Sequence, residues 1–208
     1  MKGYYFITDR NLSRLGNAHD VQSAVRAGVK IVQYREKNLG TGKIYLEALK
    51  LRKICKDIIF LINDRVDIAQ AVDADGVHLG QDDLPYLTAR KLLGKKKIIG
   101  VTVHSLKEAK LAQKQGADYI GLAPIFKTST KPDAKDPVGM KAIKEIKKHI
   151  HLPLVVIGGI NLSNAWEVIS SGADCICAIS AVVTSKNVKG RIQEFQKCFK
   201  LEMGYQAA

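Results

Sequence analysis

Three hydroxyl groups and one ammonium group stand side by side in the segment Thr128-Ser129-Thr130-Lys131. The segment follows an apolar run, Tyr119 to Phe126, with the composition of a buried strand, and Pro132 directly after it favours a turn. Hydroxyls and a lysine at the carboxyl end of a strand suit a phosphate or pyrophosphate, because they supply hydrogen-bond donors together with positive charge. A solvated polar loop is the alternative, so the interpretation depends on what lies at the ends of the other strands.

A second group of anion-binding candidates ends another strand-like run, in Gln33-Tyr34-Arg35-Glu36-Lys37. Because side chains alternate along a strand, we expect Gln33, Arg35 and Lys37 to point into the same space. Two cations buried on one face need an anion. That anion is either a ligand or a structural carboxylate, Glu36 or an aspartate.

Carboxylates follow two further strand-like runs, at Asp64 in Asn63-Asp64-Arg65 and at Asp83 in Gly80-Gln81-Asp82-Asp83. Carboxylates delivered from adjacent strand ends could share one hard cation. Magnesium typically uses one or two carboxylates together with substrate phosphates. The alternative is that the two aspartates are caps, or ion-pair partners of Arg65 and Arg35.

The later strand ends offer a second anion site. Gly158-Gly159-Ile160-Asn161 leads into a helix-like stretch, and Ile179-Ser180-Ala181 ends the last apolar run. Glycine lets backbone N–H groups approach a ligand, and a helix N-terminus adds favourable potential. His104, which follows Thr102 and Val103, is either a general base or a satisfied structural histidine. His78 lies inside a strand-like run, where we expect it to pack or to hydrogen-bond locally.

The elements that must position these side chains are short β-branched runs separated by amphipathic stretches. One stretch begins at Ser105, an expected helix N-cap with Glu108 at the capping-box position. Nearly continuous hydrophobicity is typical of parallel strands covered on both faces. The expected strands are Tyr4–Thr8, Ile31–Arg35, Ile59–Asn63, Gly76–Leu79, Ile98–Val103, Tyr119–Ala123, Leu154–Gly158 and Cys175–Ile179.

A weak internal repeat supports this alternation. A small residue or glycine, often followed by aspartate, recurs before the strands, as in Gly116-Ala117-Asp118 and Gly172-Ala173-Asp174. Glycine ends a helix in a left-handed conformation, and a strand then starts at once. About eight such βα units predict a single (β/α)8 TIM barrel over residues 1–208, whose function lies at the carboxyl ends of its strands. An open doubly wound sheet is the runner-up, disfavoured because the chain has no Gly-x-Gly-x-x-Gly turn.

Composition restricts the class of protein. The 208 residues are 46% hydrophobic and 25% charged, as in ordinary globular domains. No apolar run approaches a membrane span and no signal peptide is evident, so we expect a cytoplasmic protein without a membrane partner. The net charge of +13 raises a nucleic-acid-binding alternative. The lysines are scattered over helix faces without an aromatic stacking motif, which disfavours it.

Two anion sites and a metal at one barrel mouth suggest a transfer reaction with pyrophosphate as leaving group. The cations Arg35, Lys37 and Lys131, together with Mg²⁺, would stabilise the departing charge. No residue stands out as a nucleophile.

Five strings, in order and at compatible spacing, resemble the thiamine-phosphate synthase family. They are Val32-Gln33-Tyr34-Arg35-Glu36-Lys37, Asn63-Asp64-Arg65-Val66-Asp67-Ile68-Ala69, Asp75-Gly76-Val77-His78-Leu79-Gly80-Gln81-Asp82-Asp83, Thr128-Ser129-Thr130-Lys131 and Ile157-Gly158-Gly159-Ile160. The resemblance extends from Tyr5 to about Val183. It implies a TIM barrel that condenses 4-amino-2-methyl-5-(diphosphooxymethyl)pyrimidine with a thiazole phosphate. The products would be thiamine phosphate and pyrophosphate, formed dissociatively, with pyrophosphate leaving before the thiazole nitrogen captures a pyrimidine carbocation.

The resemblance also implies roles for single residues. Asp64 and Asp83 match the family's Mg²⁺ ligands. The residues that match its pyrimidine diphosphate site are Gln33, Tyr34, Arg35, Glu36, Lys37, Asn63, Thr102 and Lys131. Those that match its thiazole phosphate site are Thr128, Ser129, Thr130, Gly159, Ile179 and Ser180. The implied partners are these small-molecule substrates, without nucleic acid, and a homo-oligomer is compatible with this interpretation.

The chain departs from the family pattern at three positions. Tyr34 replaces a usual aliphatic residue, Thr102 a usual serine, and Ala123 a common glycine. None of the three changes removes a charge or a metal ligand. A related thiazole tautomerase, resembled at Val103-His104-Ser105-Leu106 with His104 matching its catalytic histidine, is the alternative. That enzyme has no pyrophosphate to hold, so the aspartates and the Thr-x-Thr-Lys string favour the synthase.

Overall fold

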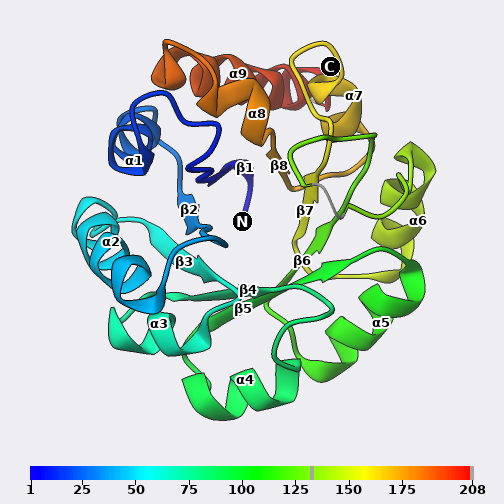
Figure 1. Ribbon diagram of the computed structural model, residues 1–208. Coiled ribbons are helices and arrows are strands. Elements are labelled where there is room, and N and C mark those ends of the chain that lie inside the picture. The colour runs from blue at the N-terminus through cyan, green and yellow to red at the C-terminus, as the bar shows by residue number, and fades with distance from the viewer. Residues whose placement is uncertain (132–133, 207–208) are drawn as a thin grey trace.

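The apolar runs form eight parallel strands that pair in chain order and close into a barrel (Figure 1). The computed structural model describes residues 1–131 and 134–206. Pairing of Gly3 with Cys175 and of Tyr4 with Ile176 joins the first strand to the last and excludes the open doubly wound sheet. The strands are β1 Gly3–Ile7, β2 Ile31–Tyr34, β3 Ile59–Asn63, β4 Gly76–Leu79, β5 Ile98–Val103, β6 Tyr119–Leu122, β7 Leu154–Ile157 and β8 Cys175–Cys177.

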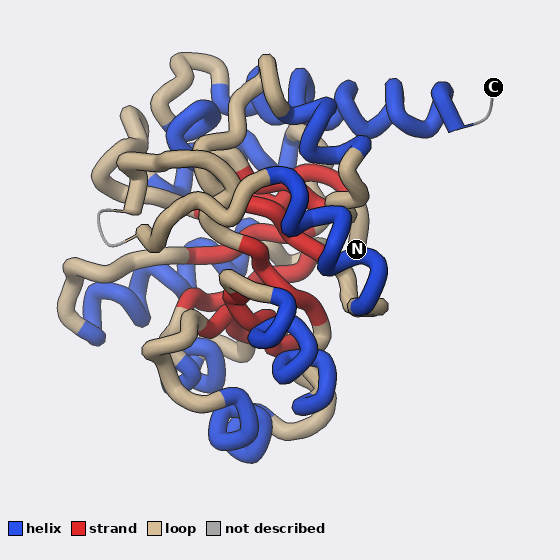
Figure 2. The backbone as a smooth tube through the Cα atoms, turned by 90° about the vertical axis from the view of Figure 1, so that its right-hand side faces the viewer, coloured by secondary structure: helices blue, strands red, loops and turns tan. Residues whose placement is uncertain are grey.

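Helices surround the barrel and cover its outer face (Figure 1). The longest of them, α9, extends beyond the body of the barrel toward the C-terminus (Figure 2). None of the described helices combines the length and hydropathy that crossing a bilayer would require. The helices are α1 Asn17–Arg26, α2 Thr41–Ile54, α3 Val66–Ala71, α4 Tyr86–Leu93, α5 Leu106–Gln115, α6 Met140–His149, α7 Ala165–Ser170, α8 Ile179–Val183 and α9 Val188–Gln206.

Local signals in the sequence set several of these boundaries. The Ser105 hydroxyl accepts a hydrogen bond from the Glu108 N–H at 3.2 Å, which confirms the expected N-cap of α5. The Glu108 carboxylate reaches back to the N–H of His104, one residue earlier than in the usual capping box. The expectation that the last strand reaches Ile179 is wrong, because β8 ends at Cys177 and Ile179 begins α8.

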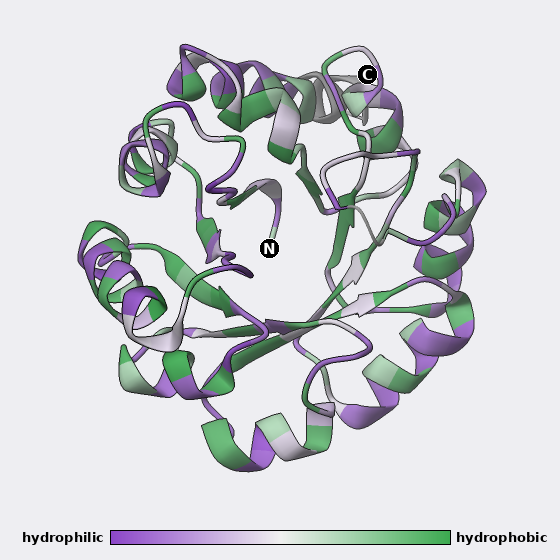
Figure 3. Cartoon of the chain, in the orientation of Figure 1, coloured by the Kyte–Doolittle hydropathy of each residue, from purple (hydrophilic) through white to green (hydrophobic). Residues whose placement is uncertain are grey.

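Alternation along the strands produces two apolar layers. Tyr4 and Phe6 of β1 belong to the large core between sheet and helices. Tyr5 and Ile7 face inward and join a smaller cluster in the barrel interior. Figure 3 shows the strands coloured predominantly apolar, with polar residues over the outward faces of the helices. The main core thus lies between the barrel of strands and the surrounding helices, and the barrel interior leaves room for polar groups at its mouth.

The repeated aspartate supports the amino-terminal rim of the barrel. Gly116 ends α5 in the left-handed conformation, with φ 91°, and β6 follows within three residues. The Asp118 carboxylate then accepts the N–H of Ile99 at 2.8 Å and pairs with Arg90 at 2.6 Å. The same arrangement recurs with Asp75, Phe60 and Arg52, and with Asp174, Leu154 and Lys147. The internal repeat therefore tethers successive strands and helices.

We predict that Gly100→Ala destabilises the fold. Gly100 lies in β5, and a Cβ atom there would overlap the ring of Tyr119, which fills the barrel interior. The free energy of unfolding in urea should fall by about 2 kcal/mol or more. Gly42→Ala in α2 is the matched control, because a Cβ there meets nothing within 4 Å. That change should add about 0.5–1 kcal/mol, and an equal effect of the two substitutions would contradict the packing described.

Candidate active site

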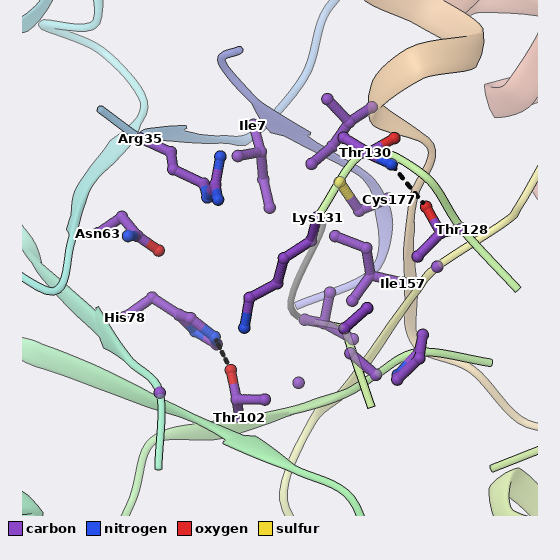
Figure 4. Close-up of a pocket in the computed structure, with 18 of the residues that line it drawn as sticks. Ile7, Arg35, Asn63, His78, Thr102, Thr128, Thr130, Lys131, Ile157 and Cys177 are labelled. Atoms are coloured by element: carbon purple, nitrogen blue, oxygen red, sulfur yellow. Dashed lines mark hydrogen bonds between the residues drawn. The ribbon is translucent and has the colours of Figure 1, made fainter. Parts of the chain in front are cut away.

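The loops at the carboxyl ends of the strands surround a cavity of about 270 Å³. Figure 4 shows its side chains converging from several strand ends, with Lys131 reaching across toward His78 and Thr102. The structure places most of the residues expected from the sequence in its lining. These are Gln33, Arg35, Lys37, Asn63, Asp64, Asp83, Thr102, Thr128, Thr130, Lys131, Gly159, Ile179 and Ser180, together with His104.

Three expected ligand-binding residues lie outside this lining. Tyr34 points to the outer face of β2, where its hydroxyl donates to Glu47 at 2.8 Å, because neighbours on a strand face opposite ways. Burial and the Glu47 carboxylate raise the pKa of Tyr34 well above its ordinary range. Glu36 is buried and accepts the N–H of Asn38 at 2.7 Å. Ser129 is exposed between Thr128 and Thr130, which face the cavity.

The hydroxyl-rich loop has a defined start. The Thr128 hydroxyl accepts the N–H of Thr130 at 3.2 Å, which turns the backbone so that both threonines face the cavity (Figure 4). The turn expected at Pro132 lies outside the described residues.

Each of the two basic side chains that follow β2 has a carboxylate partner. The Arg35 guanidinium lies 3.7 Å from Asp9, and the Lys37 ammonium contacts Asp64. Asp9 is buried and accepts the N–H groups of Asn11 and Leu12 at 3.1 Å each. The structural partner of Arg35 is thus Asp9 and not Glu36. Asp9 was missed by sequence reasoning, because an aspartate after a first strand is an unremarkable cap.

Asp64 and Asp83 face each other at the cavity edge. Asp64 adopts φ 62°, a left-handed conformation rare outside glycine, and donates its N–H to the carbonyl of His78 at 2.8 Å. Asp83 accepts the N–H of Gly80 at 2.6 Å. Burial, and next the hydrogen bond with Asp64, raise the pKa of Asp83 to about 6. Arg65 pairs with Asp67 at 2.5 Å, so it is not the partner that holds Asp64 in place.

This carboxylate pair fits a magnesium ion. Two crowded carboxylates disfavour each other's charged form, and a hard cation removes that penalty. Within residues 1–131 and 134–206, no group of three or more histidine, cysteine or acidic side chains gathers as a metal cluster. Two protein oxygens suffice for magnesium when substrate phosphates complete the shell.

The cavity floor is polar in a way that the sequence did not reveal. Tyr5, Tyr119 and His78 point inward from β1, β6 and β4, and hydrogen bonds of 2.8 Å join them to one another and to Gln33 and Thr102. Burial lowers the pKa of His78 to about 4, so the imidazole is neutral at neutral pH. The available signal was alternation, which places Tyr5 and Tyr119 on the inward face of their strands.

The opposite wall carries the glycine pair after β7. Gly158 and Gly159 have φ of 108° and 64°. A Cβ atom on Gly159 would come within 2.6 Å of the Lys127 carbonyl, so only glycine lets this turn pack against the loop after β6. Ile179 and Ser180, in the first turn of α8, face the same wall. This end of the cavity has no carboxylate lining it among the described residues.

His104 is held by the backbone. Its Nδ1 hydrogen-bonds to the carbonyl of Ala123, and since a carbonyl only accepts, Nδ1 carries the proton. The ring lines the cavity, while its orientation has a purely structural cause.

Basic and carboxylate groups at one rim, facing a glycine- and hydroxyl-rich wall, are typical of a TIM-barrel enzyme that acts on phosphorylated ligands. Comparison with known proteins specifies the family. A family model described as thiamine monophosphate synthase matches residues 4–182. The chain belongs to this family.

Individual relatives agree with the family model. Thiamine-phosphate synthase of Methanosarcina barkeri is 54% identical over 193 residues, which cover 92% of this chain and 88% of that protein. The enzyme of the same name from Chloroflexus aurantiacus is 46% identical over 196 residues, covering 92% and 90%. The solved structure of thiamine phosphate pyrophosphorylase from Pyrococcus furiosus superposes with a TM-score of 0.88 and 38% identity, covering 96% of both chains.

We predict that His78 makes stability pH-dependent. Its pKa is about 4 in the folded protein and about 6.5 when unfolded, so between these values the unfolded chain binds more protons. The free energy of unfolding should therefore fall as the pH drops from 6.5 to 4, by up to about 3 kcal/mol from this group.

Urea unfolding of wild type and His78→Gln across that range isolates the contribution, because the other titrating groups are common to both proteins. The wild type should lose more stability on acidification than the variant. Parallel pH profiles would contradict a neutral, buried His78.

Proposed function

We propose that the protein condenses 4-amino-2-methyl-5-(diphosphooxymethyl)pyrimidine with a thiazole phosphate to give thiamine phosphate and pyrophosphate. The observation that carries this proposal is the crowded pair Asp64 and Asp83 beside Lys37 and Arg35, facing the Thr128–Lys131 loop across one cavity. The names of the relatives support the same reaction.

The diphosphate would lie at the basic rim. Arg35, Lys37 and Lys131 supply positive charge there, and Asn63 supplies an amide donor. Asp64 and Asp83 would hold Mg²⁺, which when bound neutralises negative charge on the diphosphate. Lys37 already contacts Asp64, so the ammonium is positioned where phosphate oxygens would arrive.

The thiazole phosphate would lie against the opposite wall. Thr128, Thr130 and Ser180 offer hydroxyls there, and Gly159 leaves space for a close backbone approach. Between the two walls, beside the polar floor, the lining includes the apolar side chains of Ile7, Val155, Ile157 and Cys177. That surface suits a flat heterocycle whose charged groups point to both ends.

The chemistry needs a leaving group to be stabilised and not a nucleophile to be activated. The C–O bond to the diphosphate breaks and its electron pair leaves with pyrophosphate. The thiazole nitrogen then forms the C–N bond with its own lone pair, and no proton is transferred. We propose that Arg35, Lys37 and Lys131 are the catalytic residues, because each adds positive charge where the negative charge grows.

The tautomerase alternative receives no support from the comparisons. A proton shift would use a base, and His104 is the candidate that the sequence suggested. Its Nδ1–H donates to the carbonyl of Ala123, which leaves Nε2 as the ring nitrogen that could take up a proton. A tautomerase also has no need of the Asp64–Asp83 pair.

Release of pyrophosphate from the purified protein tests the proposed function. We expect release only when both substrates and Mg²⁺ are present, and none with a chelator. Folded protein that releases no pyrophosphate under these conditions would overturn the proposal, and His104→Ala would then be examined in a tautomerisation assay.

Asp83→Ala should abolish most Mg²⁺-dependent turnover without damaging the fold. We expect kcat to fall by roughly 100-fold. The free energy of unfolding should stay the same or rise, because the change removes a carboxylate crowded against Asp64. Asp57→Ala is the control, because that carboxylate is 83% exposed and its ion pair with Lys56, at 3.9 Å, is a loose surface contact. Wild-type turnover of Asp83→Ala would exclude the metal assignment.

Asp9→Asn should impair binding of the diphosphate substrate through Arg35. The amide keeps one oxygen for the N–H groups of Asn11 and Leu12 but loses the charge opposite Arg35. With the guanidinium less restrained, kcat/KM for the pyrimidine diphosphate should fall about tenfold. The KM for the thiazole phosphate should not change, and an equal effect on both substrates would argue against this positioning role.

A further inference from the structure

Five side chains form one continuous hydrogen-bonded chain across the cavity floor. Gln33 Nε2 donates to the Tyr5 hydroxyl, which meets the Tyr119 hydroxyl, and Tyr119 in turn meets Nδ1 of His78. Nε2 of His78 then meets the Thr102 hydroxyl (Figure 4). All four distances are 2.8 Å. The chain therefore joins residues of β2, β1, β6, β4 and β5 in one network.

Two strand glycines make room for this network. A Cβ atom on Gly100 would overlap the Tyr119 ring, and one on Gly121 would come within 3.0 Å of the His78 ring. Glycine weakens a strand, so its presence here reflects the close approach of these two rings. The rings of His78 and Tyr119 stack with centroids 5.4 Å apart. The network is thus a packed feature of the barrel and not a chance set of contacts.

Counting hydrogens leaves two possible directions for the chain. Each tyrosine has one hydroxyl hydrogen, and a neutral imidazole has one N–H. If Gln33 donates to Tyr5, then Tyr5 donates to Tyr119, because its hydroxyl hydrogen would otherwise be buried without an acceptor, and Tyr119 donates to Nδ1 of His78. His78 then carries its proton on Nε2 and donates to Thr102. In the reverse direction every one of these bonds is inverted and the Gln33 carbonyl faces Tyr5.

We propose that the chain runs from Gln33 to Thr102 and thereby makes the Thr102 hydroxyl a committed donor to the diphosphate. Because Nε2–H of His78 occupies a lone pair of the Thr102 oxygen, the hydroxyl hydrogen is free to point into the cavity. Lys131 reaches toward the same place (Figure 4). His78, Tyr119 and Tyr5 are positioning residues in this scheme, since they act through Thr102.

The Gln33 end of the hydrogen-bonded chain presents an acceptor to the cavity, in contrast to the donor at Thr102. Gln33 donates one amide N–H to Tyr5, and its carbonyl oxygen is then available to accept a hydrogen bond from the ligand. A carbonyl oxygen would accept from the exocyclic amino group of the pyrimidine, so the chain presents an acceptor at Gln33 and a donor at Thr102. The identity of these two ligand groups rests on the proposed function, whereas the direction of the chain does not.

The tautomer of His78 tests the direction without any substrate. In ¹⁵N-labelled wild-type protein, long-range ¹H–¹⁵N correlation spectra distinguish a protonated ring nitrogen from an unprotonated one. We expect His78 to be neutral with the proton on Nε2 at pH 7. A proton on Nδ1, or on both nitrogens, would overturn the proposal even if the protein proves to be an active synthase.

The substitution Gln33→Glu should reverse the direction of the hydrogen bonds along the chain from residue 33 to Thr102. A carboxylate only accepts, so Tyr5 must donate to it, and the proton of His78 is expected to move to Nδ1. An unchanged Nε2–H tautomer in this variant would contradict coupling along the chain.

The consequence for the reaction is measured at Thr102. Thr102→Val keeps the shape but lacks the donor, and we expect kcat to fall about 100-fold. The KM for the thiazole phosphate should not change, and Thr102→Ser should retain most of the activity. Equal kinetics for Thr102→Val and Thr102→Ser would refute the donor role. Inactivity of the wild type would instead refute the proposed function and leave the tautomer result standing.

Discussion

The like-charge contact between Asp64 and Asp83 is the constraint on which the account of this site depends. Two carboxylates at one edge destabilise each other, and burial first, then the contact with Asp64, raises the pKa of Asp83. The fold nevertheless holds both in place, Asp64 through a left-handed backbone and the carbonyl of His78, Asp83 through the N–H of Gly80. On the proposed function, a cation and a polyanionic ligand would offset this repulsion, so the site would be complementary to the charge of its ligand.

Aspartates at the amino-terminal rim of the barrel stabilise the fold instead. Asp75, Asp118 and Asp174 each accept a strand N–H and pair with a basic residue of a preceding helix. These carboxylates are satisfied by the protein and tie its strands together. The barrel thus separates stability from chemistry by position, with these three satisfied aspartates where strands begin and the crowded pair Asp64 and Asp83 where strands end.

Much of this arrangement follows from the sequence, because local rules determine it. Period-two alternation predicts that Gln33, Arg35 and Lys37 point into the same space, and all three line the cavity, although β2 ends at Tyr34 and the two basic residues follow it. The same rule sends Tyr34 outward, where its hydroxyl donates to Glu47 of α2 and its side chain lies outside the cavity lining. The family resemblance covers Gln33 to Lys37 as one motif, so it does not distinguish the residues that face the cavity from those that face outward. The expected end of β8 lies two residues beyond the observed one, because Ala178 and Ile179 continue the apolar run of the strand.

The rest depends on contacts between distant segments. Hydrogen bonds across the floor join Tyr5 to Tyr119, which are 114 positions apart, and nothing local marks either residue as a partner of the other. The pairing of Asp9 with Arg35 likewise arises from the adjacency of β1 and β2. The strand order creates the contact between Asp9 and Arg35, and the closed barrel creates the contact between Tyr5 and Tyr119, so no local pattern in the sequence encodes either of them.

Binding of pyrophosphate alone, measured by calorimetry with and without Mg²⁺, tests the central claim most directly. On the proposed function, the basic rim and the Asp64–Asp83 pair together form a metal-dependent pyrophosphate site. We expect binding that requires Mg²⁺ and weakens steeply when a chelator is added. Equal affinity with and without the metal, or no binding by folded protein under either condition, would contradict it.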